Sequence, residues 1–232
     1  MRKFDIEQIR SVHLFNDVAE AQFSNLMQAA FLQRFPAHVV LITEAERPDF
    51  LHVVVEGAVQ LFSRHDGRET TITIVRPVTT FILAAVVGDQ PYLASGRTLE
   101  PSRILMIPAE TVRAVFDQDA VFARAVVREL SRAFRGVMKE LKNHKLRSSS
   151  ERLANWLLRA QADHGGNGRF TIPFDKRTLA SCLGMTPENL SRSLAALADH
   201  GVAVHGRDVT LKDVPGLTAL ARPTPAIDDP DY

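Results

Sequence analysis

The chain has 232 residues, of which 45% are hydrophobic, and a formal net charge of +1 at pH 7. This length suits one large domain or two smaller ones, and the near-neutral charge means that nucleic-acid binding would have to come from local patches. One cysteine excludes a disulfide framework and any four-cysteine metal or iron–sulfur site. Because it has neither an apolar run of about 18 residues nor a signal-peptide pattern, we expect a cytoplasmic protein with no membrane partner.

The first half of the chain predicts helices followed by short strands. Residues 4–35 place apolar side chains largely at helical spacing, and from residue 39 the period changes to that of strands. Residues 51–75 hold two β-rich runs around Asp66-Gly67, which is a hairpin signal. Many short strands with Gly and Pro turns predict an antiparallel β-roll over residues 1–118. Further strands are expected at 79–83 and 102–108.

A long helix is expected over residues 119–146, with apolar side chains recurring at spacings of three and four. A stripe on so long a helix favours pairing with a second copy over packing on its own roll. The helix is also basic, with eight basic residues against two acidic ones between Arg124 and Arg147, which is typical of a solvated face. The residues expected at the dimer contact are Val126, Leu130, Ala133, Val137 and Leu141.

The C-terminal part predicts a winged helix-turn-helix over residues 147–222, after a polar break at 147–150. Residues 176–183 form a short amphipathic helix, Gly184 breaks it, and a second helix starts almost at once. Residues 202–211 then alternate apolar and polar side chains as a small hairpin does. The Pro- and Asp-rich tail, residues 223–232, is expected to be disordered.

The second helix of this pair carries a polar face with the composition of a base-reading surface. Thr186 is a good N-cap, and Glu188, Ser191 and Arg192 follow at i, i+3 and i+4 on one face. On an isolated helix this would be a solvated face with a weak ion pair, but in a helix-turn-helix it enters the major groove. There, Arg reads guanine, Glu can accept from cytosine, and Ser adapts to either.

Other polar residues nearby are expected to contact phosphate or groove positions, which fixes the register without reading sequence. They are Lys176, Arg177, Thr178, Thr186, Asn189 and Arg207. Cys182 lies in the same motif and is expected to be a small core residue.

The order of roll, long helix and winged helix, with Glu-x-x-Ser-Arg on the reading helix, resembles the CRP/FNR superfamily of bacterial transcription regulators. The resemblance spans about residues 13–220 and is most specific in 179–197 and 148–158. It implies an α+β chain with a cyclic-nucleotide-binding-like roll, a homodimer on double-stranded DNA, and RNA polymerase as a partner. The Ser before Arg192 marks the FNR-like branch, which implies half-sites of TTGAT type contacted by Glu188 and Arg192.

The effector of the roll is expected to differ from a cyclic nucleotide. Readers of cyclic nucleotides in this superfamily carry Gly-Glu and, about ten residues later, Arg followed by Ser or Thr. Here Ala84-Ala85 replace the acid, Tyr92 to Ala94 replace the Arg, and Arg97 is about three residues out of register. An apolar organic effector is one alternative, and plain filling of the roll core is the other. The pocket would use Leu83, Ala84, Ala85, Val86, Tyr92, Leu93 and Arg97.

Haem is the second sensing hypothesis, because relatives use it to detect nitric oxide or carbon monoxide. It needs an axial ligand such as His13, His38, His52 or His65, although each is more typical of a surface or core histidine. A dimer that binds DNA without any effector also stays open. The sequence lacks the usual hydrolase, phosphate-loop and metalloprotease motifs, so we do not expect an enzyme.

Overall fold

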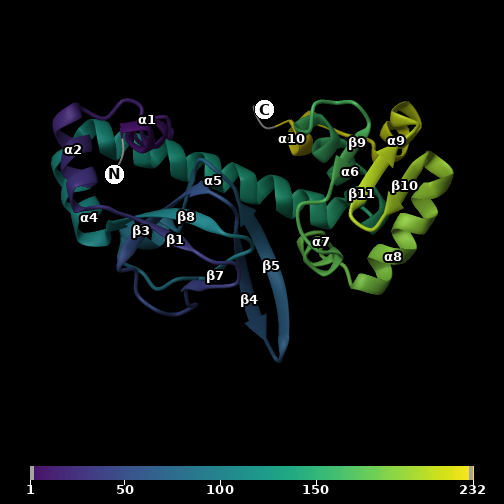
Figure 1. Cartoon of the computed structure of the whole chain (residues 1–232), viewed down its shortest axis with the longest axis horizontal. Helices are drawn as coiled ribbons and strands as arrows, with labels where there is room; N and C mark the ends of the chain where they lie inside the picture. Colours follow the sequence, from purple (N-terminus) through teal and green to yellow (C-terminus); the bar gives the residue numbers. More distant parts are fainter. Residues whose placement is uncertain (1–2, 230–231) are drawn as a thin grey trace. The chain divides into compact units, whose positions relative to one another are not determined.

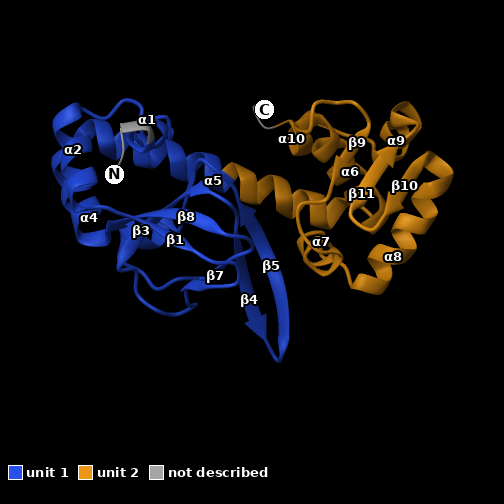
Figure 2. Ribbon diagram, in the orientation of Figure 1, with its two compact units in different colours: residues 1–134 blue, residues 135–232 orange. Residues whose placement is uncertain are grey.

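The computed structural model describes residues 3–229 and Tyr232. It divides into two compact units, residues 1–134 and 135–232 (Figure 2). Helix α5 (Ala120–Leu146) starts in the first unit and ends in the second, so the long helix predicted over 119–146 is confirmed.

The first unit consists of short helices around two antiparallel sheets (Figure 1). One sheet has the strand order β1-β8-β3-β6 and the other β2-β7-β4-β5, which confirms the predicted antiparallel roll. Its elements are α1 (Lys3–Arg10), α2 (Glu20–Ala29), β1 (Phe31–Phe35), β2 (Val40–Ile42), β3 (Phe50–Glu56), β4 (Val59–His65), β5 (Arg68–Val75), β6 (Thr79–Phe81), α3 (Leu83–Gly88), β7 (Ser95–Thr98), β8 (Ser102–Pro108) and α4 (Ala109–Gln118).

The hairpin predicted at Asp66-Gly67 joins β4 to β5. Both turn residues have positive φ, 49° and 73°, which suits the two-residue turns that match strand twist. His65 pairs directly with Arg68 across the turn, so the register of β4 on β5 is fixed at its tip.

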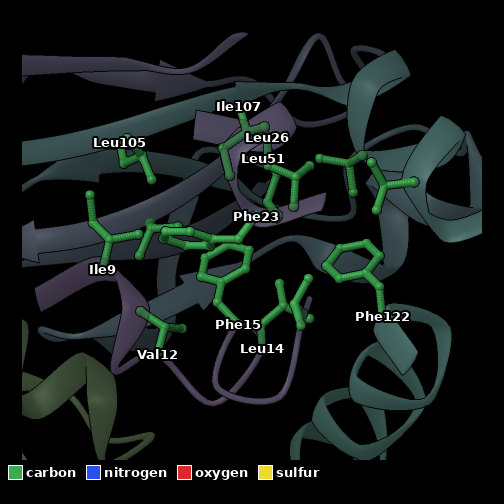
Figure 3. Packing of buried hydrophobic residues seen from close by; sticks show 14 of the residues in the cluster. Ile9, Val12, Leu14, Phe15, Phe23, Leu26, Leu51, Leu105, Ile107 and Phe122 are labelled. Atoms are coloured by element: carbon green, nitrogen blue, oxygen red, sulfur yellow. The ribbon is translucent and has the colours of Figure 1, made fainter. Parts of the chain in front are cut away.

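Two apolar clusters stabilise this unit. The larger one joins β3 and β8 to the helices and includes Phe15, Phe23, Leu51 and Phe122 (Figure 3). Phe122 belongs to the first turn of α5, so that end of the long helix is part of the roll's core. The second cluster joins the two sheets and contains Ile42, Val54, Val59, Val75, Phe81, Tyr92 and Ile104.

Two local predictions for the first unit were wrong, and one helix was missed. Residues 31–35 are a strand, because backbone pairing with β8 overrides the helical spacing expected up to residue 35. The strand expected at 79–83 ends at Phe81, since Ile82 takes a left-handed φ of 61° and Leu83 starts helix α3. Helix α4, inside the expected roll, was not predicted.

The second unit is a helix-turn-helix followed by a wing. Its elements are α6 (Ser149–Asp163), β9 (Arg169–Thr171), α7 (Lys176–Cys182), α8 (Pro187–Ala196), the 3₁₀ helix η1 (Leu197–His200), β10 (Val202–His205), β11 (Asp208–Leu211), α9 (Val214–Ala221) and α10 (Pro225–Asp228). Strands β10 and β11 form the predicted hairpin. Strand β9 pairs with β11 and was missed because three residues give no readable period.

The tail expected to be disordered contains the helical turn α10. Ile227 is buried, and Asp228 forms a salt bridge with Arg147 at 2.5 Å. These two contacts order this part of the tail, and its Pro- and Asp-rich composition alone did not predict them.

Candidate nucleic-acid interface and sensor site

Helix α8 begins sharply because its first turn is capped. The Thr186 hydroxyl accepts a hydrogen bond from the Asn189 N–H at 3.2 Å, and Pro187 occupies the first turn. Gly184 has a φ of 61°, which lets α7 turn into α8 within a few residues. Leu190 and Leu197 are buried, so the opposite face of the helix is the one presented to solvent.

That outward face carries Glu188, Ser191 and Arg192, all exposed. Hydrogen bonds from the Glu188 backbone and from Thr186 hold the pKa of the Glu188 carboxyl below its usual value, and the charge of Arg192 adds to this. The Arg192 guanidinium donates to the side-chain oxygen of Asn189. The face therefore presents one carboxylate, one hydroxyl and one guanidinium side by side.

Most of the other expected DNA contacts lie in the same unit at exposed positions. Lys176 and Arg177 form the first turn of α7, and Arg207 lies in the turn between β10 and β11. The half-buried Thr178 donates its backbone N–H to the Asp175 carboxylate at 2.6 Å, so Asp175 is the residue that caps α7.

A groove of about 450 Å³ separates α8 from strand β10. Its lining includes Lys176 and Ser191, which the sequence singled out, together with Lys212 and His205, which it did not. The alternating pattern of the hairpin could have identified Lys212 and His205, since both are polar positions in or beside its strands. A groove with basic side chains and no acidic residue in its lining can receive an anionic backbone.

The seven expected effector-pocket residues do not converge. Leu83 and Val86 lie in the larger cluster, whereas Ala85 and Tyr92 pack in the cluster between the sheets. Ala84 is exposed and Leu93 is 90% exposed, so neither side chain faces the interior.

Arg97 points away from the cluster between the sheets. The neighbouring Gly96 faces Ile42 and Leu61, so strand alternation turns Arg97 to the other face. There its guanidinium stacks on the Phe62 ring at 4.4 Å and pairs with Glu69 at 2.5 Å. Its Nε donates to Gln60 at 2.8 Å. Of the two expected pocket residues Tyr92 and Arg97, only Tyr92 therefore lies in the cluster between the sheets.

Tyr92 is the buried polar side chain of the inter-sheet cluster. Burial raises the pKa of its phenol to about 12, with a further contribution from the charge of Asp49. Its backbone N–H donates to Glu46 and its carbonyl accepts from Ala45, both at 2.9 Å. The phenol thus stays neutral, and the Tyr92 backbone is held in place.

Of the four candidate haem-ligating histidines, His13, His38 and His65 are exposed and His52 is buried. His38 has a φ of 66°, a backbone conformation usually taken by glycine. Burial lowers the pKa of His52 to about 4, so its imidazole is neutral. In the described residues its Nδ1 has no hydrogen-bond partner, and no cluster of three potential metal ligands occurs.

Cys182 is half-buried.

The apolar stripe of α5 has two parts. Val126 is fully buried in the core of the first unit and Leu130 packs against it. Farther along, Ala133, Val137 and Leu141 are exposed, as are Phe134 and Met138.

Two family matches decide the identity of the chain. Residues 32–119 match the cyclic nucleotide-binding domain, and residues 151–220 match the Crp-like helix-turn-helix domain. The chain belongs to the CRP/FNR family of transcription regulators.

Relatives agree with this assignment. The CRP-like cAMP-activated global transcriptional regulator of Mycobacterium tuberculosis is 25% identical over 194 residues, covering 81% of this chain and 87% of the relative. The transcriptional activator protein Anr of Pseudomonas aeruginosa is 24% identical, covering 72% and 71%. The crystal structure of a putative regulator of this family from Eubacterium rectale has a TM-score of 0.75 at 21% identity, covering 90% and 98%.

As a CRP/FNR regulator, the chain is a DNA-binding transcription regulator and not an enzyme, as the sequence indicated. Over the described residues, no helix is both long and apolar enough to cross a membrane.

Proposed function

We propose that this CRP/FNR regulator binds, as a homodimer, to palindromic DNA with half-sites of TTGAT type. The observation that carries the proposal is the exposed face of α8, with Glu188, Ser191 and Arg192 opposite a buried leucine face. Arg192 would read guanine O6 and N7 in the major groove, and Glu188 would accept from cytosine N4. Lys176, Arg177, Thr178 and Arg207 would position the unit on phosphates, with Thr186 and Asn189 at the start of α8.

The homodimer is supported by the apolar part of α5 that the chain leaves uncovered. Val137 is 65% exposed and Leu141 45% exposed, and both lie with Ala133 at helical spacing. A second copy of α5 would bury this stripe as a coiled coil does. Pairing would give two reading helices, as a two-fold half-site arrangement requires.

The effector is proposed to be a small, mainly apolar compound. Ala84 and Ala85 offer no carboxylate for a ribose, and Tyr92 stands where cyclic-nucleotide readers carry an arginine. Arg97 already has Glu69, Gln60 and Phe62 as partners on the other face of its strand. A cyclic phosphate among Ile42, Leu61 and Phe81 would lose its hydration, and no guanidinium would neutralise its charge there, so its binding would be unfavourable. The neutral Tyr92 phenol would be the polar anchor.

Haem is the second candidate effector, and one observation favours it. The buried imidazole of His52 lies 5.2 Å from the Phe81 ring and has an Nδ1 without a partner among the described residues. A neutral imidazole is the form that ligates iron. A sharp Soret band at a defined stoichiometry after addition of haemin would establish haem over the organic compound.

The proposed regulation is a shift of population. The effector would bind better to the DNA-competent arrangement of the dimer and so favour it. RNA polymerase is the proposed partner at the promoter. Equal DNA affinity with and without any bound compound would instead favour an effector-independent dimer.

The experiment is a binding titration of the wild-type chain at fixed salt on three duplexes. One carries two TTGAT half-sites about one helical turn apart, one has 5 extra base pairs between them, and one is scrambled. We expect the first to bind about 10³-fold or more tightly than the scrambled duplex. The insertion should remove most of that preference, because it turns the second half-site to the opposite side of the duplex. Equal affinity for all three would contradict the proposal.

A further inference from the structure

The two charged side chains on the outward face of α8 are not paired with each other. Glu188 and Arg192 stand at i and i+4, a spacing that favours an ion pair on an isolated helix. Among the residues that the structure describes, no ion pair within 4.0 Å joins these two. Each is instead held by a different polar neighbour at the start of the helix.

Arg192 is held by Asn189, which lies one turn before it. The guanidinium of Arg192 donates to Oδ1 of Asn189, and because a guanidinium has only donors, the amide must present its oxygen there. Asn189 is half-buried, whereas Arg192 is exposed. A charged donor makes this bond stronger than one between neutral groups, so the bond restrains a side chain that otherwise has many rotamers.

Glu188 is held from the other direction, by the cap of α8. The Thr186 hydroxyl accepts from the Asn189 N–H at 3.2 Å and donates to the Glu188 carboxylate. One hydroxyl can form both bonds, since it has a donor as well as acceptor sites. The N-terminal end of the helix dipole also favours a carboxylate at this position. A continuous chain of hydrogen bonds therefore runs from Glu188 through Thr186 and Asn189 to Arg192.

We infer that Asn189 is a positioning residue for base reading, because its amide oxygen keeps Arg192 away from Glu188. This role rests on the proposed function. A guanidinium and a carboxylate bound to each other would have to separate before they could contact guanine and cytosine, and side chains free to rotate would lose entropy on binding. The bond to Asn189 uses one N–H group of Arg192, and the others can still reach guanine O6 and N7.

A direct contact of Asn189 with phosphate would have a different effect on DNA binding. A phosphate contact carries no sequence information, so it adds about equally to the affinity for every duplex. Positioning of Arg192 adds only to the affinity for the operator. The ratio of the affinities for the TTGAT duplex and a scrambled one, and its dependence on Arg192, therefore separate the two roles.

A double-mutant cycle on the full-length chain, at constant salt, makes this separation. Asn189→Ala should lower the ratio about 3- to 10-fold, the cost of ordering one flexible side chain on binding, and alanine does not weaken the helix. In the Arg192→Ala background the same change should alter the ratio by less than about twofold, because Asn189 acts through Arg192. Equal effects in both backgrounds, or no effect of Asn189→Ala alone, would overturn the inference.

Two further variants test whether the amide oxygen is responsible. Asn189→Asp keeps an oxygen acceptor at the same place, so the ratio should stay within about twofold of the wild type. The added negative charge should lower the affinity for both duplexes together. Asn167→Ala makes the same truncation at an exposed asparagine before β9 and should leave the ratio unchanged. A ratio as low in Asn189→Asp as in Asn189→Ala would contradict the role of the oxygen.

A measurement without DNA tests the arrangement of the side chains itself. In Asn189→Ala, Arg192 loses its acceptor and can pair with Glu188, so the pKa of the Glu188 carboxyl should fall below its wild-type value in an NMR titration of the full-length chain. An unchanged pKa would overturn the inference. A lowered pKa together with an unchanged ratio in Arg192→Ala would instead show that the arrangement on α8 is correct and that the proposed base reading is wrong.

Discussion

His52 shows how a single residue can make the sensor unit sensitive to pH. Its imidazole is 3% exposed and lies between the rings of Phe50 and Phe81, at 6.4 and 5.2 Å. Burial lowers its pKa from 6.5 to about 4, so the folded unit holds this side chain neutral at physiological pH. The unfolded chain binds a proton there near pH 6.5, and protons therefore favour unfolding.

We expect the free energy of unfolding of the first unit to fall by about 2 kcal/mol between pH 7 and pH 5 because of His52. His52→Phe should remove this part of the pH dependence, since the phenyl ring suits the aromatic surroundings. Urea titrations of the full chain, followed by a signal from the first unit, measure it. His65→Gln, at an exposed turn, should keep the wild-type slope, and an equal slope in His52→Phe would contradict the account.

Arg97 is a residue whose surroundings could not be predicted from its position in the sequence. Its closeness to Tyr92 in sequence suggested a shared pocket, but strand alternation places the two side chains in different environments. In contrast, Glu188, Ser191 and Arg192 were assigned to one exposed face from helical spacing, and they lie on one. Spacing within a regular helix is fixed by the backbone, whereas a side chain's partners across a sheet depend on register.

At the scale of elements, strong periodicity in the sequence was sufficient to predict α5, α7, α8 and the hairpin of the wing. Among the elements missed, α3, α4 and β9 are short or follow a strand directly, so their signals merge with those of their neighbours. The turn α10 could not be predicted from composition, because it depends on the pairing of Asp228 with Arg147 across 81 positions. Long-range ion pairs leave no local pattern.

Helix α5 also gives the test of the dimer. Val137→Asp should shift the chain from dimer to monomer, since it places a charge in the middle of the uncovered stripe. Ile72→Asp makes the same kind of change at a position of similar exposure, 54% against 65%, on strand β5. Sedimentation velocity over a concentration series should show a monomer only for the first variant. A monomeric wild type, or a dimer in both variants, would contradict the proposed contact.

For the whole molecule, the two matched families describe the two ends of the chain, and α5 connects them. The first unit contributes a roll whose inter-sheet cluster has a neutral Tyr92 phenol and no matching nucleotide-binding arginine at that position. The second contributes the exposed face of α8 that we propose reads bases, and a groove with basic side chains. In the proposed function, regulation depends on how α5 transmits a change between them, and sequence specificity depends on Glu188, Ser191 and Arg192 of α8.

The measurement that tests this account most directly is the preference of Arg192→Ala for the TTGAT duplex over a scrambled one, at constant salt. We predict that the ratio of the two affinities falls by about 10- to 100-fold, because one bidentate base contact is lost, while dimerisation and binding to scrambled DNA are kept. Arg159→Ala, which removes an exposed arginine from α6, should keep the wild-type ratio. An unchanged ratio in Arg192→Ala would show that this face of α8 does not read the operator.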